Sequence, residues 1–178
     1  MRVKFHGKDF KLSYSYEQIK EAIGSIAQQI NKDYEGQRPL LICILNGSFM
    51  FAADLCKELN IEVEISFLKL ATYSGTSSTG KIKKLIGLNE ELKDRSVIIL
   101  EDIVDTGFTI NEVINQVNEH NPSEIKVATL LFKPDALQMP VHLDYVGIEI
   151  PNEFIVGYGL DFDGLGRNLK DIYTIIES

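Results

Sequence analysis

Three acidic side chains and a Thr-Gly-x-Thr turn occur together in segment 97–109 of this 178-residue chain. The apolar run 97–100 predicts a buried strand, which Glu101 and Asp102 should end. Asp105 then opens a turn that continues into a helix. Backbone amides of such a turn, a helix N-terminus and threonine hydroxyls together suit an anion such as a phosphate.

The acids themselves need a different partner, because carboxylates repel phosphate. Ribose hydroxyls, a magnesium ion or a proton transfer would suit them. A phosphate cradle beside acids that bind a diol describes a site for a sugar phosphate. The alternative is a solvated acidic turn with an ordinary helix cap at Thr109. The position directly after a buried strand argues against that alternative.

Other polar segments follow predicted strands but are ambiguous by themselves. Asn46-Gly47 could be an ordinary turn or one that presents backbone amides, since asparagine tolerates unusual backbone angles. The small polar residues 74–80 predict a mobile loop, with or without a catalytic role. Lys133 closes an apolar strand, where most lysines are only solvated. Without the other segments, Asp161 and Arg167 would be interpreted as ordinary surface charges.

Segment 97–109 closely resembles the phosphoribosyl pyrophosphate signature of the type I phosphoribosyltransferases. Five further segments between Leu45 and Arg167 are similar, in order and spacing, to the hypoxanthine-guanine branch of that family. The resemblance implies a purine-salvage enzyme. Such an enzyme joins hypoxanthine or guanine to phosphoribosyl pyrophosphate, with Mg²⁺ as cofactor, and gives the nucleoside 5′-monophosphate and pyrophosphate.

The resemblance also assigns residues to each part of the site. The phosphoribosyl group would be bound by Glu101, Asp102, Asp105, Thr106, Gly107, Phe108 and Thr109. Pyrophosphate would be bound by Leu45, Asn46, Gly47 and Arg167. The purine would be bound by Lys133, Phe154, Ile155 and Asp161. Magnesium would be ligated by Glu101, Asp102 and Asp161. The catalytic residues would be Asp105, Thr72 and Tyr73.

The chemistry behind these implied roles is specific. Asp105 would exchange a proton with nitrogen 7 of the purine. Lys133 would donate to the 6-oxo group and so reject adenine, whose 6-amino group is itself a donor. Phe154 would stack on the base. Thr72 and Tyr73 would fold over the reacting centre and exclude water.

Two positions depart from the family pattern. Asn46 stands where many relatives carry a lysine, so a charge contact with pyrophosphate is lost while presentation of the backbone amides is retained. Phe108 stands where relatives often carry a polar or basic residue, which removes a side-chain contribution to phosphate binding.

The elements that position these residues can be read from apolar periodicity and caps. Helices are expected over 16–34, 48–59 and 109–119, the first from a capping box of Ser15 and Gln18. Strands are expected over 40–45, 63–73, 96–100 and 125–132, with short strands in 141–176. This alternation predicts an α/β fold with a parallel sheet flanked by helices, and the site loops at one edge. The resemblance adds a small hood formed by the N- and C-terminal segments, all within one domain, 1–178.

Composition excludes several classes of protein. The net charge of −8 argues against a nucleic-acid surface. No apolar run approaches the roughly 20 residues of a membrane span, and residues 1–6, with a charge but no apolar stretch after it, do not predict a secretory signal. Cys43 and Cys56 fit core positions in a reducing compartment, so we expect a cytoplasmic protein.

Two alternatives in function stay open. A regulator could bind the same sugar pyrophosphate as an effector, although the catalytic acid Asp105 is present. The base could also be xanthine or a pyrimidine, since Lys133 and Phe154 favour a 6-oxopurine without ranking one. The resemblance further implies a homodimer or homotetramer.

Overall fold

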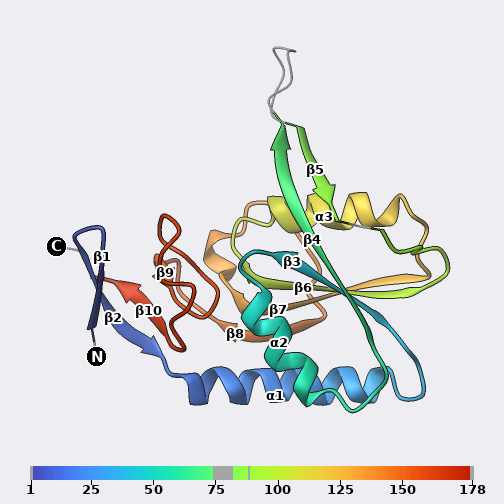
Figure 1. The fold of residues 1–178 in the computed structure, drawn as a ribbon, viewed down its shortest axis with the longest axis horizontal. Helices are drawn as coiled ribbons and strands as arrows, with labels where there is room; N and C mark the ends of the chain where they lie inside the picture. The colour runs from blue at the N-terminus through green and yellow to red at the C-terminus, as the bar shows by residue number, and fades with distance from the viewer. Residues whose placement is uncertain (1, 74–81, 88, 177–178) are drawn as a thin grey trace.

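The computed structural model describes residues 2–73, 82–87 and 89–176, and its larger sheet has the strand order β5-β4-β3-β6-β7-β8. The parallel strands of this sheet are β3 (Leu40–Leu45), β4 (Glu64–Tyr73), β6 (Ser96–Val104), β7 (Glu124–Phe132) and β8 (Tyr145–Glu149). At one edge, β5 (Ile82–Ile86) pairs antiparallel with β4. The sheet confirms the predicted parallel α/β core (Figure 1).

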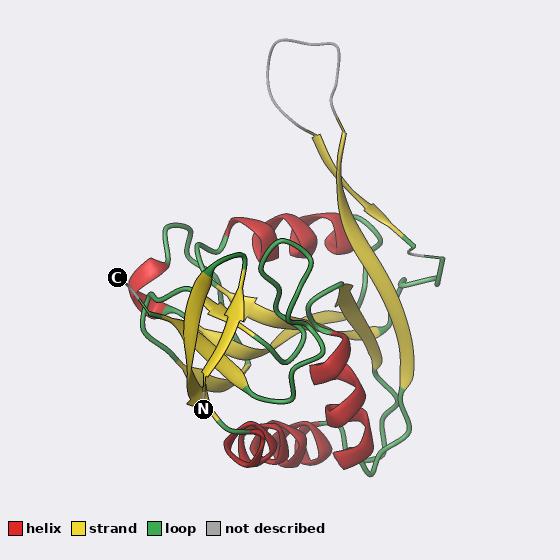
Figure 2. Cartoon of the chain, turned by 60° about the vertical axis from the view of Figure 1, so that its left-hand side comes forward, coloured by secondary structure: helices red, strands yellow, loops and turns green. Residues whose placement is uncertain are grey.

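Helices cover both faces of this sheet, with α1 (Tyr16–Asp33) and α2 (Phe49–Glu58) on one side and α3 (Phe108–Asn118) on the other (Figure 2). The continuous apolar sequence of β3 follows from this arrangement. Leu41 and Cys43 pack with α1 and α2, whereas Leu40 and Ile42 pack with α3. A short 3-10 helix, Pro134–Ala136, follows β7.

The first helix begins where the sequence predicts. The Ser15 hydroxyl accepts a hydrogen bond from the Gln18 amide, and the Gln18 side chain accepts one from the Ser15 amide. Four isoleucines and an alanine on one side of α1 are buried in the main core. The predicted capping box and apolar stripe are therefore both confirmed.

A second, antiparallel sheet forms the hood and contains both ends of the described chain (Figure 1). Its order is β1 (Arg2–Phe5), β2 (Lys8–Tyr14), β10 (Ile172–Ile175) and β9 (Ile155–Val156). Phe10, Val156 and Tyr173 form a small separate core beneath it. The hood expected from the family resemblance is confirmed, although the individual strands β1, β2 and β5 were not expected from the sequence pattern.

One predicted boundary is wrong. Glu101 and Asp102 do not end the strand, because β6 continues to Val104. The reason is its central position between β3 and β7: pairing with β7 extends as far as Val104 opposite Phe132. The acid pair is thereby drawn into the sheet and buried.

The segment predicted to fold over the reacting centre lies largely outside the described residues. Thr72 and Tyr73 lie in β4 by their backbone, their side chains are not described, and residues 74–80 lie outside the described residues. Among the described helices, none has the length and apolar character required to cross a membrane.

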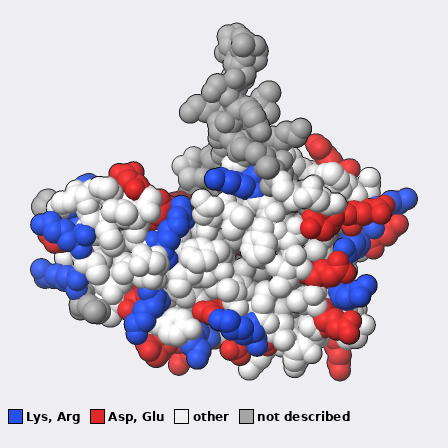
Figure 3. Space-filling view, viewed as in Figure 1, with Lys and Arg blue, Asp and Glu red and all other residues white. Residues whose placement is uncertain are grey.

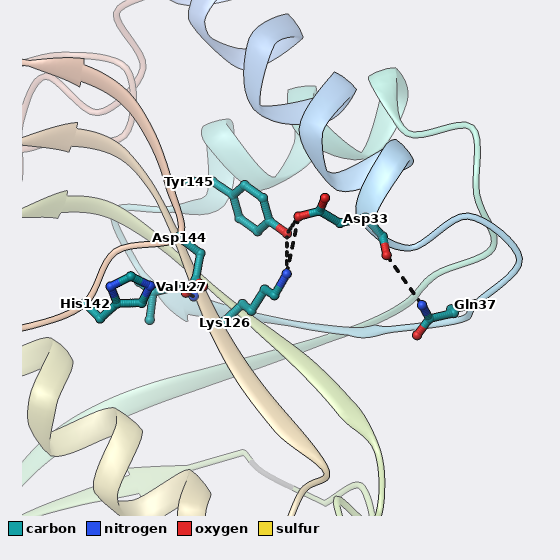
Figure 4. Close-up of polar contacts among 7 residues, drawn as sticks. All are labelled: Asp33, Gln37, Lys126, Val127, His142, Asp144 and Tyr145. Atoms are coloured by element: carbon teal, nitrogen blue, oxygen red, sulfur yellow. Dashed lines mark hydrogen bonds and ion pairs between the residues drawn. The ribbon is translucent and has the colours of Figure 1, made fainter.

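A polar cluster closes the end of the sheet opposite the predicted site (Figure 4). The Tyr145 hydroxyl donates to Asp33 Oδ2 over 2.7 Å. Lys126 Nζ lies 3.3 Å from the same oxygen and 3.2 Å from the Tyr145 hydroxyl. These contacts join the last turn of α1 to the beginnings of β7 and β8.

Replacing Tyr145 by phenylalanine should reduce stability at neutral pH but much less in acid. The hydrogen bond from Tyr145 holds the pKa of Asp33 below its usual value. Stability from a lowered carboxyl pKa is present above the unfolded-state pKa and is lost as pH falls through the folded-state pKa. We expect a loss of about 1 kcal/mol at pH 7. Denaturant unfolding of wild type and Tyr145→Phe over a pH series from neutral into acid measures it, and a loss that stays constant as the pH falls through the range where Asp33 is protonated would contradict the argument.

Candidate active site

The turn after β6 forms a pocket of about 280 Å³ at the carboxyl end of the sheet. The pocket is lined by the end of β6, the turn and the start of α3: Glu101, Asp102, Ile103, Val104, Asp105, Thr106, Gly107, Thr109 and Ile110. Gly107 caps α3 with a φ of 86°, a left-handed conformation that favours glycine. Because the first amides of a helix have no partner within it, this end of the pocket suits an anion.

Two adjacent buried carboxylates form the inner wall of the pocket. Glu101 and Asp102 are 7% and 9% exposed. Burial, followed by the negative charge of Asp102, raises the pKa of Glu101 well above its usual value. Burial also raises the pKa of Asp102. Glu101 Oε2 is buried without a hydrogen-bond partner, which is costly unless a ligand supplies one.

This pair suits a cation, but the predicted three-acid magnesium site is not preformed. Among the described residues, no group of three or more His, Cys, Asp or Glu side chains is arranged to hold a metal ion. Asp161 is instead engaged by Arg167. Magnesium commonly binds one or two protein carboxylates and completes its shell with water and substrate phosphate. The unpartnered Glu101 oxygen beside Asp102 fits that mode.

The turn from β3 into α2, residues 45–48, lies directly against the acid pair. The Leu45–Asn46 peptide bond is cis. A Cβ at Gly47 would overlap the Asp102 carboxylate, so only glycine allows this approach. Ser48 precedes α2, but its hydroxyl donates to the Ile44 carbonyl over 2.6 Å and does not cap the helix as expected.

Lys133 and Asp105 form an ion pair at the ends of two neighbouring strands. Lys133 Nζ lies 3.3 Å from Asp105 Oδ2. The lysine side chain is 8% exposed and the aspartate side chain 46% exposed, so the pair is buried on the lysine side and open on the aspartate side. A proton donor and a proton acceptor are thus presented together at the rim.

The C-terminal loop brings the predicted arginine and aspartate together. Arg167 Nη2 lies 2.6 Å from Asp161 Oδ1, and Arg167 Nη1 donates to the Gly159 carbonyl over 2.7 Å. A Cβ at Gly159 would overlap the Gly47 carbonyl. This loop therefore packs against the 45–48 turn, which places Arg167 beside the residues predicted to bind pyrophosphate.

Three other predicted site residues, Phe154, Ile155 and Phe108, do not line the pocket after β6. Phe154 is 44% exposed and lines a separate cavity of about 700 Å³ beside the hood. Its ring meets that of Phe162 edge-on, with centroids 5.3 Å apart. Ile155 is buried in the main core. Phe108 begins α3 and is 50% exposed, so it is free of the core. The purine contacts assigned to Phe154 and Ile155 stay predictions.

The site therefore combines a buried acid pair in β6 with a turn whose helix N-terminus suits an anion. The model of the phosphoribosyl transferase domain matches residues 15–163. The chain belongs to the phosphoribosyl transferase family. Among relatives of this phosphoribosyltransferase, the hypoxanthine-guanine phosphoribosyltransferase of Streptococcus thermophilus is 39% identical over 94% of this chain and 93% of its own. That of Mycobacterium tuberculosis is 39% identical over 89% of this chain and 82% of its own.

Solved structures agree with this assignment. A hypoxanthine-guanine phosphoribosyltransferase of Bacillus anthracis is 36% identical, has a TM-score of 0.86, and covers 93% of this chain and 98% of its own. The hypoxanthine phosphoribosyltransferase of Trypanosoma cruzi is 34% identical, has a TM-score of 0.83, and covers 94% of this chain and 97% of its own. The shared fold is the one expected of a type I phosphoribosyltransferase.

Sequence reasoning missed a hydrogen bond that joins the C-terminal loop to α2, the helix after the 45–48 turn. Tyr158, between two glycines, is buried and donates to Asp54 on α2. The Gly-Tyr-Gly pattern was the available signal, because a large side chain between two glycines marks a tight bend. No local pattern identified Asp54 as its partner.

Proposed function

We propose that this phosphoribosyltransferase joins hypoxanthine or guanine to phosphoribosyl pyrophosphate and releases pyrophosphate. The ion pair of Lys133 and Asp105 is the observation that carries this proposal. In a 6-oxopurine, oxygen 6 and nitrogen 7 lie on the same edge of the base. A lysine donor 3.3 Å from a carboxylate acceptor matches that edge when nitrogen 7 carries a proton. In adenine the 6-amino donor would oppose the lysine.

The sugar pyrophosphate would occupy the adjoining surfaces. Its 5-phosphate fits the turn at the start of α3, and its ribose hydroxyls face the Glu101–Asp102 pair. Its pyrophosphate lies between the 45–48 turn and Arg167, whose planar fork suits a diphosphate. When bound, a magnesium ion held by Glu101, Asp102 and substrate oxygens would supply positive charge to the leaving pyrophosphate.

The residues of this chain then serve the transfer in distinct ways. Lys133 orients the base through its oxo group, and Asp105 takes or returns the proton of nitrogen 7 as the other imidazole nitrogen attacks the sugar. Arg167 stabilises charge on the departing pyrophosphate. The relative positions of base and sugar are set by strand ends, β6 and β7, that are rigidly paired.

Steady-state kinetics test this function. With phosphoribosyl pyrophosphate and magnesium, hypoxanthine and guanine should each give the nucleoside 5′-monophosphate, whereas adenine should react at least about 10³-fold less efficiently, as kcat/KM. Omitting magnesium should abolish most turnover. Binding of phosphoribosyl pyrophosphate without turnover of any purine would indicate an effector-binding protein instead. Efficient use of adenine would contradict the assigned role of Lys133.

A homodimer or homotetramer remains part of the proposal. It is supported by exposed apolar side chains on α2 and β4, elements on the face of the molecule whose centre shows few charged side chains (Figure 3). Phe49, Ile65 and Phe67 are each more than 40% exposed there. Large exposed apolar areas mark contact surfaces. We also propose a cytoplasmic location, which the free thiols of Cys43 and Cys56 support.

A further inference from the structure

Asp54, on the helix that follows the 45–48 turn, accepts hydrogen bonds from three side chains. The Tyr158 hydroxyl donates to Oδ2 over 2.6 Å, and the Tyr16 hydroxyl donates to the same oxygen over 3.3 Å. Lys57 Nζ donates to Oδ1 over 2.7 Å. Burial alone would raise the pKa of Asp54, but the hydrogen bonds from Lys57 and Tyr158 outweigh it and lower the pKa. Tyr158 is therefore bonded to a carboxylate, which makes the bond a strong one.

Tyr158 has a backbone conformation that needs such support. Its φ is 48°, in the left-handed region, which is unfavourable for a bulky residue. The residue is 1% exposed. Its amide donates to the Leu169 carbonyl over 2.8 Å. Backbone in this region persists only where the surroundings fix it, and here the hydroxyl is fixed at one end and the amide at the other.

The next residue carries this constraint into the site. Gly159 packs so closely on the Gly47 carbonyl that no side chain fits between them. The Gly159 carbonyl also accepts the hydrogen bond from Arg167 Nη1, over 2.7 Å. A shift of Tyr158 would therefore displace two elements at once, the 45–48 turn and Arg167. Both elements belong to the pyrophosphate end of the site.

We propose that Asp54 and Tyr158 are positioning residues for the pyrophosphate group of the substrate. Their hydrogen bond holds segment 157–159 against the 45–48 turn, so that backbone amides and Arg167 face the same diphosphate. This assignment rests on the proposed function and deepens it. It predicts a larger effect on phosphoribosyl pyrophosphate than on the base, because Lys133 and Asp105, which serve the base, directly follow β7 and β6.

Removing the tyrosine hydroxyl tests the proposal against a matched control. Tyr158→Phe should raise KM for phosphoribosyl pyrophosphate about tenfold, the scale of one hydrogen bond to a charged group, and leave KM for hypoxanthine within about twofold. The control is Tyr145→Phe. It removes a tyrosine hydroxyl from a second cluster of the same kind, Tyr145–Asp33–Lys126, at the far end of the sheet. It should lower thermal stability to a similar extent without moving either KM.

Substitutions of the acid separate hydrogen bonding from packing. Asp54→Asn keeps an acceptor for Tyr158 and should stay within about threefold of wild type in KM for phosphoribosyl pyrophosphate, whereas Asp54→Leu should match Tyr158→Phe. An unchanged KM for phosphoribosyl pyrophosphate in both Tyr158→Phe and Asp54→Leu would overturn the proposal. Equal increases for both substrates, or an equal increase in Tyr145→Phe, would overturn it as well.

A binding measurement separates this proposal from the reaction itself. Calorimetric titration with magnesium pyrophosphate should show about tenfold weaker binding to Tyr158→Phe than to wild type. If wild type binds pyrophosphate but forms no nucleotide from any purine, the proposed reaction fails while this comparison still decides the role of Tyr158. If both proteins bind pyrophosphate equally, the positioning role fails even when wild type is fully active.

Discussion

Replacing Asp105 by asparagine should lower kcat roughly 10²-fold, the usual scale of help from a positioned acid or base. Asparagine has nearly the same shape and keeps an oxygen that can accept from Lys133 Nζ, which now lies 3.3 Å from Asp105 Oδ2. What asparagine cannot do is take a proton from nitrogen 7 of the base. The expected result is therefore a fall in kcat with KM for phosphoribosyl pyrophosphate little changed. Steady-state kinetics with hypoxanthine and guanine measure both quantities.

Asp135→Asn is the matched control for this experiment. Asp135 is an exposed carboxylate in the short helix after β7 and lies outside the pocket. Its loss changes the net charge of the chain by the same amount, so kcat should stay near that of wild type. A fall of less than about threefold in Asp105→Asn would assign the proton transfer to water instead.

The parallel core was predictable because its signals are local. Leu40–Leu45 is apolar without alternation, since both faces of β3 are covered, and that run alone indicates a buried strand. The 97–109 segment could also be recognised locally, because the acids, the turn and the start of α3 are consecutive in the chain. Its pocket in the structure is lined by residues of this segment and by Ile110, which follows it directly.

The hood was not predictable strand by strand, since its pairing joins the two ends of the chain. In β2, Phe10 lies opposite Ile175 of β10, and most neighbouring residues of β2 are exposed. Such half-exposed segments form strands because they pair with a partner far away in the sequence. The boundary of β6 was misjudged for the same kind of reason, because pairing with β7, which the local sequence does not reveal, extends the strand past the acid pair.

Within the site, too, local features could be predicted from the sequence and contacts between distant segments could not. Each predicted residue could be named from its own segment, but the pairs could not. Lys133 meets Asp105 across 28 positions of the chain, and Tyr158 meets Asp54 across 104. The close approach of Gly47 to Asp102 likewise arises only in the tertiary structure, and it explains why that turn needs glycine.

Replacing Lys133 by alanine should weaken binding of the base between about tenfold and hundredfold, the range for hydrogen bonds to charged groups. The side chain is 8% exposed and presents its ammonium group at the rim beside Asp105. Without it, the oxo group of hypoxanthine or guanine loses its donor, and the 6-amino group of adenine no longer meets a competing donor. KM for both 6-oxopurines should rise, and their advantage over adenine in kcat/KM should shrink.

Lys126→Ala provides the control, because Lys126 lies near the start of β7 and Lys133 directly follows its end. Both substitutions remove one positive charge and one long side chain, from the two ends of β7. Lys126 contacts Asp33 and Tyr145 at the far end of the sheet, so its loss should affect stability and leave both KM values unchanged. In Lys133→Ala, KM for phosphoribosyl pyrophosphate should stay near that of wild type. If that KM rises while the KM for the base does not, the purine lies elsewhere and Lys133 serves the sugar.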